Sequence, residues 1–185
     1  MRLKTPREKR ILYIKTTVRW FLYFLIIFLS FTVMTTGTWT KPVLLVPVAL
    51  CIAISNDTIV SAYTGAFCGF MIDIACDRLF GYNAVILTIF CALVSLIHDL
   101  YLRKKFFNYL WITALVSFLQ CWLDYKFYYE MWNYADVERI FHNITLKVWL
   151  YTMISSVVIY IIFAIINKFL MPKEHLTIED VIRTN

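Results

Sequence analysis

Glycine, proline and charged residues are all scarce in this chain of 185 residues. It has four glycines and four prolines, and only 16% of its residues are charged. A soluble domain is about a quarter charged and about half apolar, whereas 61% of this chain is hydrophobic and its mean hydropathy is +0.70. These proportions exclude an ordinary soluble domain. Because the apolar residues come in long runs, the sequence predicts an integral membrane protein with a single domain.

The sequence also lacks the spacings of common catalytic and metal-binding motifs. Its three histidines form no His-Glu-x-x-His pattern, and no glycine-rich phosphate loop is present. Its five cysteines lie in or beside apolar runs without Cys-x-x-Cys spacing, which is typical of buried free thiols. We therefore expect no enzyme activity, no metal and no cofactor.

The excess of positive charge lies at the flanks of the apolar runs. The net charge is +6, but basic residues in these places act as topology signals and meet anionic lipid headgroups. Nucleic-acid binding is therefore not expected. The first apolar run is long and lacks a small-residue cleavage site, which argues against a signal peptide.

Six apolar segments predict an all-α membrane protein with six transmembrane helices. They cover residues 18–36, 42–56, 58–76, 84–101, 106–123 and 148–170. As a helix the second would rise only about 22 Å, short of a hydrocarbon core of about 30 Å, and Pro47 would interrupt it. It is either a tilted, kinked span or a segment buried among other helices. Asn56 or Asp57 could cap the third helix, so the second and third segments form a hairpin.

The distribution of basic residues predicts the topology. With a cytoplasmic N-terminus and six crossings, 13 of the 18 Lys and Arg residues lie on the cytoplasmic side. The positive-inside rule then puts both termini in the cytoplasm. The chain divides into a basic N-terminus (1–17), a membrane domain (18–170) with an outer loop (124–147), and a cytoplasmic tail (171–185).

Three of the four glycines lie close together, in the third segment and in the turn after it. A helix there aligns Ser61, Gly65, Gly69 and Asp73 at steps of four residues on one face, and Gly81 follows in the turn. Small residues let another helix backbone approach closely within a membrane. This face packs either against the protein's own interior or against a partner.

Asp73 is an acidic residue inside an apolar segment, where a carboxylate is costly. One interpretation has it near the outer surface, reaching water or pairing with Arg78. Another makes it a buried anchor for the packing of the second, third and fourth segments, or a site that receives a partner helix. A proton relay is a third, but no second intramembrane carboxylate is evident.

The outer loop is rich in aromatic residues. It is either an interfacial segment anchored by its rings in the headgroup region or a docking surface for an extracytoplasmic partner. The interaction candidates are Tyr128, Trp132 and Tyr134.

The stretch from residue 41 to about residue 132 resembles the rod shape-determining protein MreD family. The resemblance rests on the proline-containing second span, the Asn56-Asp57 turn, the run Gly65-x-x-x-Gly69-x-x-x-Asp73, and Gly81. The chain length, the six spans and the basic N-terminus fit the same family.

This resemblance implies a non-enzymatic membrane subunit of the bacterial elongation, or cell-shape, machinery in the inner membrane. It implies binding to a bitopic MreC-like protein and, through it, to a SEDS glycosyltransferase and a class B penicillin-binding transpeptidase. It also implies a fold similar to the substrate-binding subunits of energy-coupling-factor vitamin transporters. The structural or partner-binding positions would be Pro47, Gly65, Gly69, Asp73 and Gly81.

Two other classes compete with this interpretation. A substrate-binding subunit of an uptake transporter needs a ligand pocket and usually small residues in the first span, which here is bulky. A membrane enzyme needs acidic pairs or metal-type clusters, which the sequence lacks.

Overall fold

A computed structural model describes residues 6–36, 42–100, 106–131, 139 and 141–170. The regular secondary structure of these ranges is all helical, which confirms the predicted all-α class. The α-helices are α1 (Pro6–Thr35), α2 (Leu45–Ser55), α3 (Thr58–Ala75), α4 (Tyr82–Leu100), α5 (Phe106–Tyr125) and α7 (Leu146–Leu170). Two π-helical turns, η1 (Lys126–Glu130) and η2 (Phe141–Thr145), extend α5 and lead into α7.

Five helical segments of the described chain are long and apolar enough to cross a membrane: Arg10–Thr35, Thr58–Ala75, Tyr82–Leu100, Phe106–Glu130 and Phe141–Leu170. The remaining helix, α2, has 11 residues and rises only about 16 Å. The expected six helices are present, but only five of them reach across a bilayer by length.

Helix α2 is the core of the molecule. Every residue from Leu45 to Ala53 is buried, and α2 packs against all five of the other α-helices. A helix that is apolar on all sides is stable only when it is enclosed. Two forms were predicted for the second segment, a tilted, kinked span or a segment buried among other helices. The structure shows the buried form.

The expected interruption at Pro47 is wrong. The helix begins at Leu45, so Pro47 lies in its first turn, where N–H groups have no intrahelical acceptor and a proline costs little. The backbone before α2 also has a hydrogen-bond partner, because the Val43 N–H donates to Thr152 Oγ1 of α7 at 2.9 Å.

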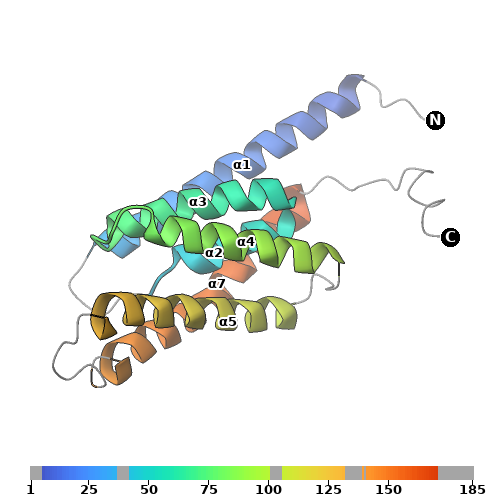
Figure 1. The fold of residues 1–185 in the computed structure, drawn as a ribbon. Helices are drawn as coiled ribbons and strands as arrows, with labels where there is room; N and C mark the ends of the chain where they lie inside the picture. Colours follow the sequence, from blue (N-terminus) through green and yellow to red (C-terminus); the bar gives the residue numbers. More distant parts are fainter. Residues whose placement is uncertain (1–5, 37–41, 101–105, 132–138, 140, 171–185) are drawn as a thin grey trace.

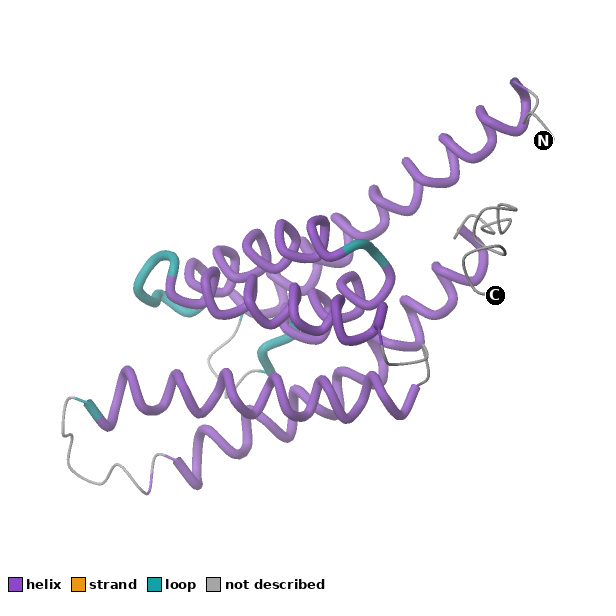
Figure 2. Tube along the Cα trace, turned by 45° about the vertical axis from the view of Figure 1, so that its right-hand side comes forward, coloured by secondary structure: helices purple, strands orange, loops and turns teal. Residues whose placement is uncertain are grey.

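The helices are arranged around α2 in pairs. Helices α3 and α4 run antiparallel beside each other, α5 and α7 form a second pair, and α1 lies along α3 (Figure 1). The start of α1 projects beyond the other helices and lies at the same end of the molecule as the end of α7 (Figure 2). Helix α1 thus includes residues expected in the separate N-terminal segment, because it begins at Pro6.

Candidate functional site

The glycine face of α3 packs against α4. A Cβ added to Gly69 would lie 2.3 Å from the Ala84 Cα, and one added to Gly65 would lie 2.8 Å from the Leu87 carbonyl oxygen. Both distances are too short for any side chain, so the glycines permit backbone contact between the two helices. Of the two alternatives for this face, the structure shows the protein's own interior.

Asp73 lies one turn beyond Gly69 on the same face and is only 1% exposed. Its Oδ2 accepts a hydrogen bond from the Gly81 N–H at 2.8 Å. Its Oδ1 accepts two from Asn83, from the backbone N–H at 3.1 Å and from Nδ2 at 2.9 Å. These donors stand at the start of α4, where N–H groups lack intrahelical partners and negative charge is favourable. Asp73 therefore caps α4 from inside α3.

Gly81 serves this cap through its backbone. Its φ of 97° lies in a region that other L-residues rarely adopt. This conformation turns the chain between α3 and α4 so that the Gly81 N–H faces the Asp73 carboxylate.

The capping network continues into α5. The Asn83 Oδ1 accepts a hydrogen bond from Gln120 Nε2 at 2.9 Å, and both side chains are buried. We call Asp73, Gly81, Asn83 and Gln120 the Asp73 cluster. It joins α3, α4 and α5. Our sequence reasoning missed Asn83 and Gln120, although two amides within apolar segments could have pointed to them.

Arg78 pairs with a residue other than Asp73. Its Nη1 lies 3.4 Å from Asp124 Oδ2 at the end of α5, and its guanidinium lies 4.4 Å from the centre of the Tyr128 ring. The Tyr128 hydroxyl also accepts a hydrogen bond from the Leu79 N–H at 3.0 Å. The interpretation that paired Asp73 with Arg78 is wrong. The Asp73 carboxylate accepts its hydrogen bonds from the start of α4, and Arg78 pairs with Asp124.

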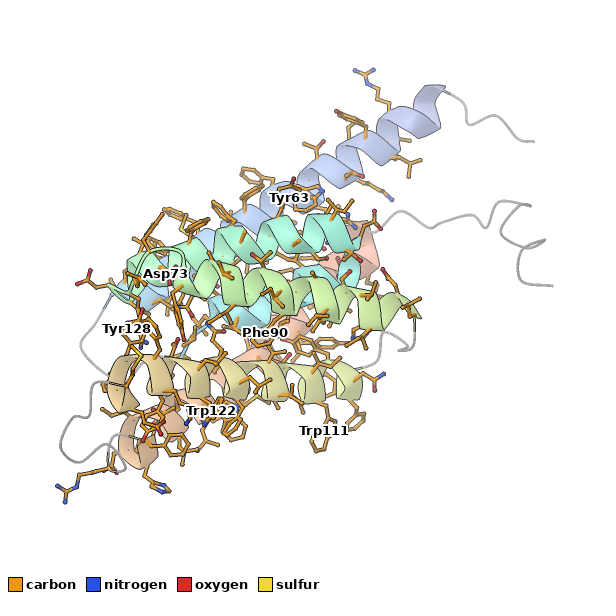
Figure 3. The ribbon with its side chains drawn as sticks, viewed as in Figure 1. Tyr63, Asp73, Phe90, Trp111, Trp122 and Tyr128 are labelled. Carbon is orange, nitrogen blue, oxygen red and sulfur yellow. The ribbon has the colours of Figure 1, made fainter. Side chains whose placement is uncertain are left out.

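Tyr128 is the one outer-loop candidate within the described chain, since Trp132 and Tyr134 lie outside it. Figure 3 shows Tyr128 and Asp73 at the same end of the bundle. Tyr128 packs on the turn between α3 and α4, and its ring also lies edge-on to Tyr82, with centroids 5.6 Å apart. Its aromatic ring and hydroxyl are thus in contact with the protein itself.

A second polar network joins the helices at the opposite end of the bundle. Buried Arg19 of α1 donates to Asn56 Oδ1 at 3.1 Å, just after α2. The Tyr23 hydroxyl donates to Asn167 Oδ1 of α7 at 2.5 Å, and Asn167 Nδ2 donates to Ser55 Oγ at 2.9 Å. This network was not predicted, because its members are far apart in the sequence.

Pro47 contributes to the same core through its backbone. Its carbonyl oxygen accepts a hydrogen bond from the Tyr109 hydroxyl at 3.4 Å. The Tyr109 hydroxyl is equally close, at 3.4 Å, to the Ser156 carbonyl oxygen of α7. Tyr109 is 1% exposed, so it connects α5, α2 and α7 in the interior.

The acidic, histidine and cysteine side chains are dispersed. In the part of the chain that the structure describes, no three of them are grouped so as to hold a metal ion. Asp73 and Asp124 each face different donors, namely the start of α4 and Arg78. The polar groups of this interior mainly join helices to one another.

These features define the class of the protein: a multi-pass, all-helical membrane protein with an enclosed central helix and a polar network at each end of the bundle. The model of the family described as rod shape-determining protein MreD matches residues 9–173. The chain belongs to this family, and its role lies in the determination of rod shape. No curated protein and no solved structure matches the chain, so the likeness to energy-coupling-factor subunits stays a prediction.

Proposed function

We propose that this protein is a non-enzymatic scaffold of the bacterial elongation machinery. It binds a bitopic MreC-like protein and, through it, a SEDS glycosyltransferase and a class B penicillin-binding transpeptidase. It does so from the bacterial inner membrane, with both termini in the cytoplasm. The observation that carries the proposal is the match of the MreD family model to residues 9–173.

The geometry of the Asp73 cluster supports a structural function for the residues singled out in the sequence. The Asp73 carboxylate accepts three hydrogen bonds from Gly81 and Asn83, and α4 packs directly against Gly65 and Gly69. We propose that these three residues, together with Gly81 and Pro47, shape the bundle and make no direct contact with a partner.

Partner contacts then fall on surfaces that the bundle leaves open. The faces of α1 and α5 that point away from the core carry large exposed side chains, such as Phe21, Phe107 and Trp111, which are 67–76% exposed. Large exposed apolar faces suit either lipid or another membrane helix. We propose that Trp132 and Tyr134 of the outer loop add contacts to the extracytoplasmic part of the bitopic partner.

Co-purification tests this proposal. The full-length protein, co-expressed with the MreC-like protein of its own source and extracted in mild detergent, should elute with that partner. The double variant Trp132→Ala/Tyr134→Ala should reduce the recovered partner several-fold. Phe169→Ala removes an aromatic ring that is 69% exposed at the end of α7, away from the outer loop and from the faces of α1 and α5, and should leave the recovery unchanged. A monodisperse protein that elutes alone would contradict the proposal.

A further inference from the structure

A groove runs along the surface of the bundle between α1 and α3. It has a volume of about 400 Å³, and its lining is almost wholly apolar; the side chains include Trp20, Phe24 and Ile27 of α1 and Val60, Thr64 and Phe67 of α3. Tyr63 stands at its edge, on the side of α3 that lies toward α1 (Figure 3). The residues increase in number in the same direction along both helices, so the two walls run parallel for about 10 Å. The Phe24 and Phe67 rings, with centroids 6.1 Å apart, bridge the two walls.

A positive charge that has no carboxylate partner within the described part of the chain lies at the end of the groove where Trp20 and Val60 stand. Arg19, the residue before Trp20, is 8% exposed, and its guanidinium lies 5.7 Å from the centre of the Tyr23 ring, which also lines the groove. Its hydrogen bond to Asn56 is to a neutral amide, and its buried Nε has no partner among the described residues. No described carboxylate lies within ion-pair distance of it.

A buried arginine of this kind favours an anionic ligand. Charge within a membrane protein is costly when it is unpaired, and the guanidinium group is suited to phosphate because it presents several N–H donors in one plane. Helix α3 begins at the same end, but the exposed Asp57 at its N-cap position places a negative charge there. The attraction for an anion therefore comes from the arginine and not from the start of the helix.

We propose that this groove binds one anionic phospholipid. An acyl chain lies between α1 and α3, and the phosphate lies beside Arg19. The exposed Arg10 and Lys15, earlier on α1, add positive charge where headgroups of the same leaflet gather. The ligand is a lipid and not a second helix, because the groove is almost wholly apolar and the cation at its end has no carboxylate within ion-pair distance among the described residues.

Native mass spectrometry of the full-length, delipidated protein tests the proposal. The protein is titrated with phosphatidylglycerol or phosphatidylcholine of the same chain length. We expect a single-lipid adduct, with phosphatidylglycerol favoured about fivefold, the order of effect of one basic side chain near a membrane surface. Equal uptake of the two lipids would overturn the proposal.

Two variants separate the contributions of the chain and the headgroup. Thr64→Trp fills the groove and should lower the abundance of the single-lipid adduct at least tenfold. Val85→Trp, at a site on α4 that is 63% exposed, should leave that abundance unchanged. Arg19→Gln should abolish the preference for phosphatidylglycerol, and Arg19→Lys should restore part of it. If Thr64→Trp loses its helical circular dichroism, Val60→Trp takes its place.

The same variants expose the competing occupant. If an adduct survives in both groove-filling variants, the lipid binds elsewhere and the proposal is wrong. A different outcome is that the wild-type protein carries a single-span protein through purification. If the groove-filling variants lose that protein and take up lipid as before, the groove holds a helix, which also contradicts the proposal.

Discussion

Asp73 illustrates at the scale of one residue how a carboxylate is kept within an apolar helix. Three hydrogen bonds from Gly81 and Asn83 replace its hydration, and the N-terminal end of α4 supplies favourable dipoles. Because these donors have no other acceptor, the carboxylate and the start of α4 satisfy each other.

We therefore expect Asp73→Asn to destabilise the protein. The amide has only one acceptor oxygen, so its NH₂ group must face either the Gly81 N–H or the Asn83 donors. Leaving a buried donor unsatisfied costs about 1–3 kcal/mol, and a lower midpoint of thermal unfolding in detergent measures this loss. Asp99→Asn, an exposed carboxylate at the end of α4, is the control and should have little effect. Equal midpoints for the two variants would contradict the capping role.

The glycine face leads to a second prediction at this scale, a ranking of two substitutions. Alanine is normally the better helix former by about 0.5–1 kcal/mol, so Gly→Ala stabilises a helix with open space beside it. Here Gly69→Ala meets three backbone atoms at 2.3–2.6 Å, whereas Gly65→Ala meets one at 2.8 Å and the Cys91 side chain. We expect both to lower the unfolding midpoint, with Gly69→Ala lowering it more. A rise in either midpoint would contradict close packing of α3 on α4.

Sequence reasoning identified the glycine face of α3, but only Asp73 and Gly81 of the Asp73 cluster. The spacing of four residues placed Gly65, Gly69 and Asp73 on one helix face because that periodicity is local. It could not give the donors to Asp73, since these depend on the turn at Gly81. The partner of Arg78 was equally beyond it, because Asp124 is 46 residues away and reaches Arg78 only through the packing of α5.

At the scale of elements, α2 is the most demanding part of the fold. Its 11 residues begin within the bundle, so the backbone before it must be satisfied by other helices. Thr152 supplies that acceptor for Val43, and Tyr109 approaches the carbonyl of Pro47. The sequence marked this segment as too short and proline-bearing, but its enclosure follows from contacts with every other α-helix.

Thr152→Val tests this arrangement. The substitution keeps the shape of the side chain and leaves the Val43 N–H without an acceptor, which costs about 1–3 kcal/mol in a buried site. Thr88→Val is the matched control, because the Thr88 hydroxyl bonds only within α4, to the Ala84 carbonyl oxygen. Amide hydrogen exchange should rise at residues 43–46 and 48 in Thr152→Val alone. Unchanged exchange there would show that the bond does not hold α2 in place.

At the scale of the whole molecule, the apolar runs predicted the helices and their order but not their ends. Helix α1 begins at Pro6, well before the apolar run. Hydropathy identifies only the apolar part of a helix, so it did not reveal that the basic residues before that part are helical too. The polar network of Arg19, Asn56, Tyr23, Asn167 and Ser55 was missed for a related reason. Its residues are separated by up to 144 positions in a single hydrogen-bonded pair, so only the assembled bundle brings them together.

The topology yields a labelling prediction. Cys76 is exposed at the end of α3, whereas Cys51, Cys68 and Cys91 are buried. With both termini in the cytoplasm, an impermeant maleimide should label Cys76 in spheroplasts that carry a Cys121→Ser protein, from which the partly exposed Cys121 is removed, and a further Cys76→Ser change should abolish the labelling. In the Cys76→Ser background, Asp57→Cys should react only in inverted vesicles. The reverse pattern would contradict the positive-inside assignment.

Cell shape tests the central claim most directly, that this member of the MreD family is a scaffold for rod-shaped growth. The measurement is the width and aspect ratio of cells of the source bacterium as the protein is depleted and then re-expressed. We predict that depleted cells widen and round, that the wild-type protein restores rods, and that Asp73→Asn, matched for membrane level, restores them less well. Cells that stay rod-shaped after full depletion would contradict the account.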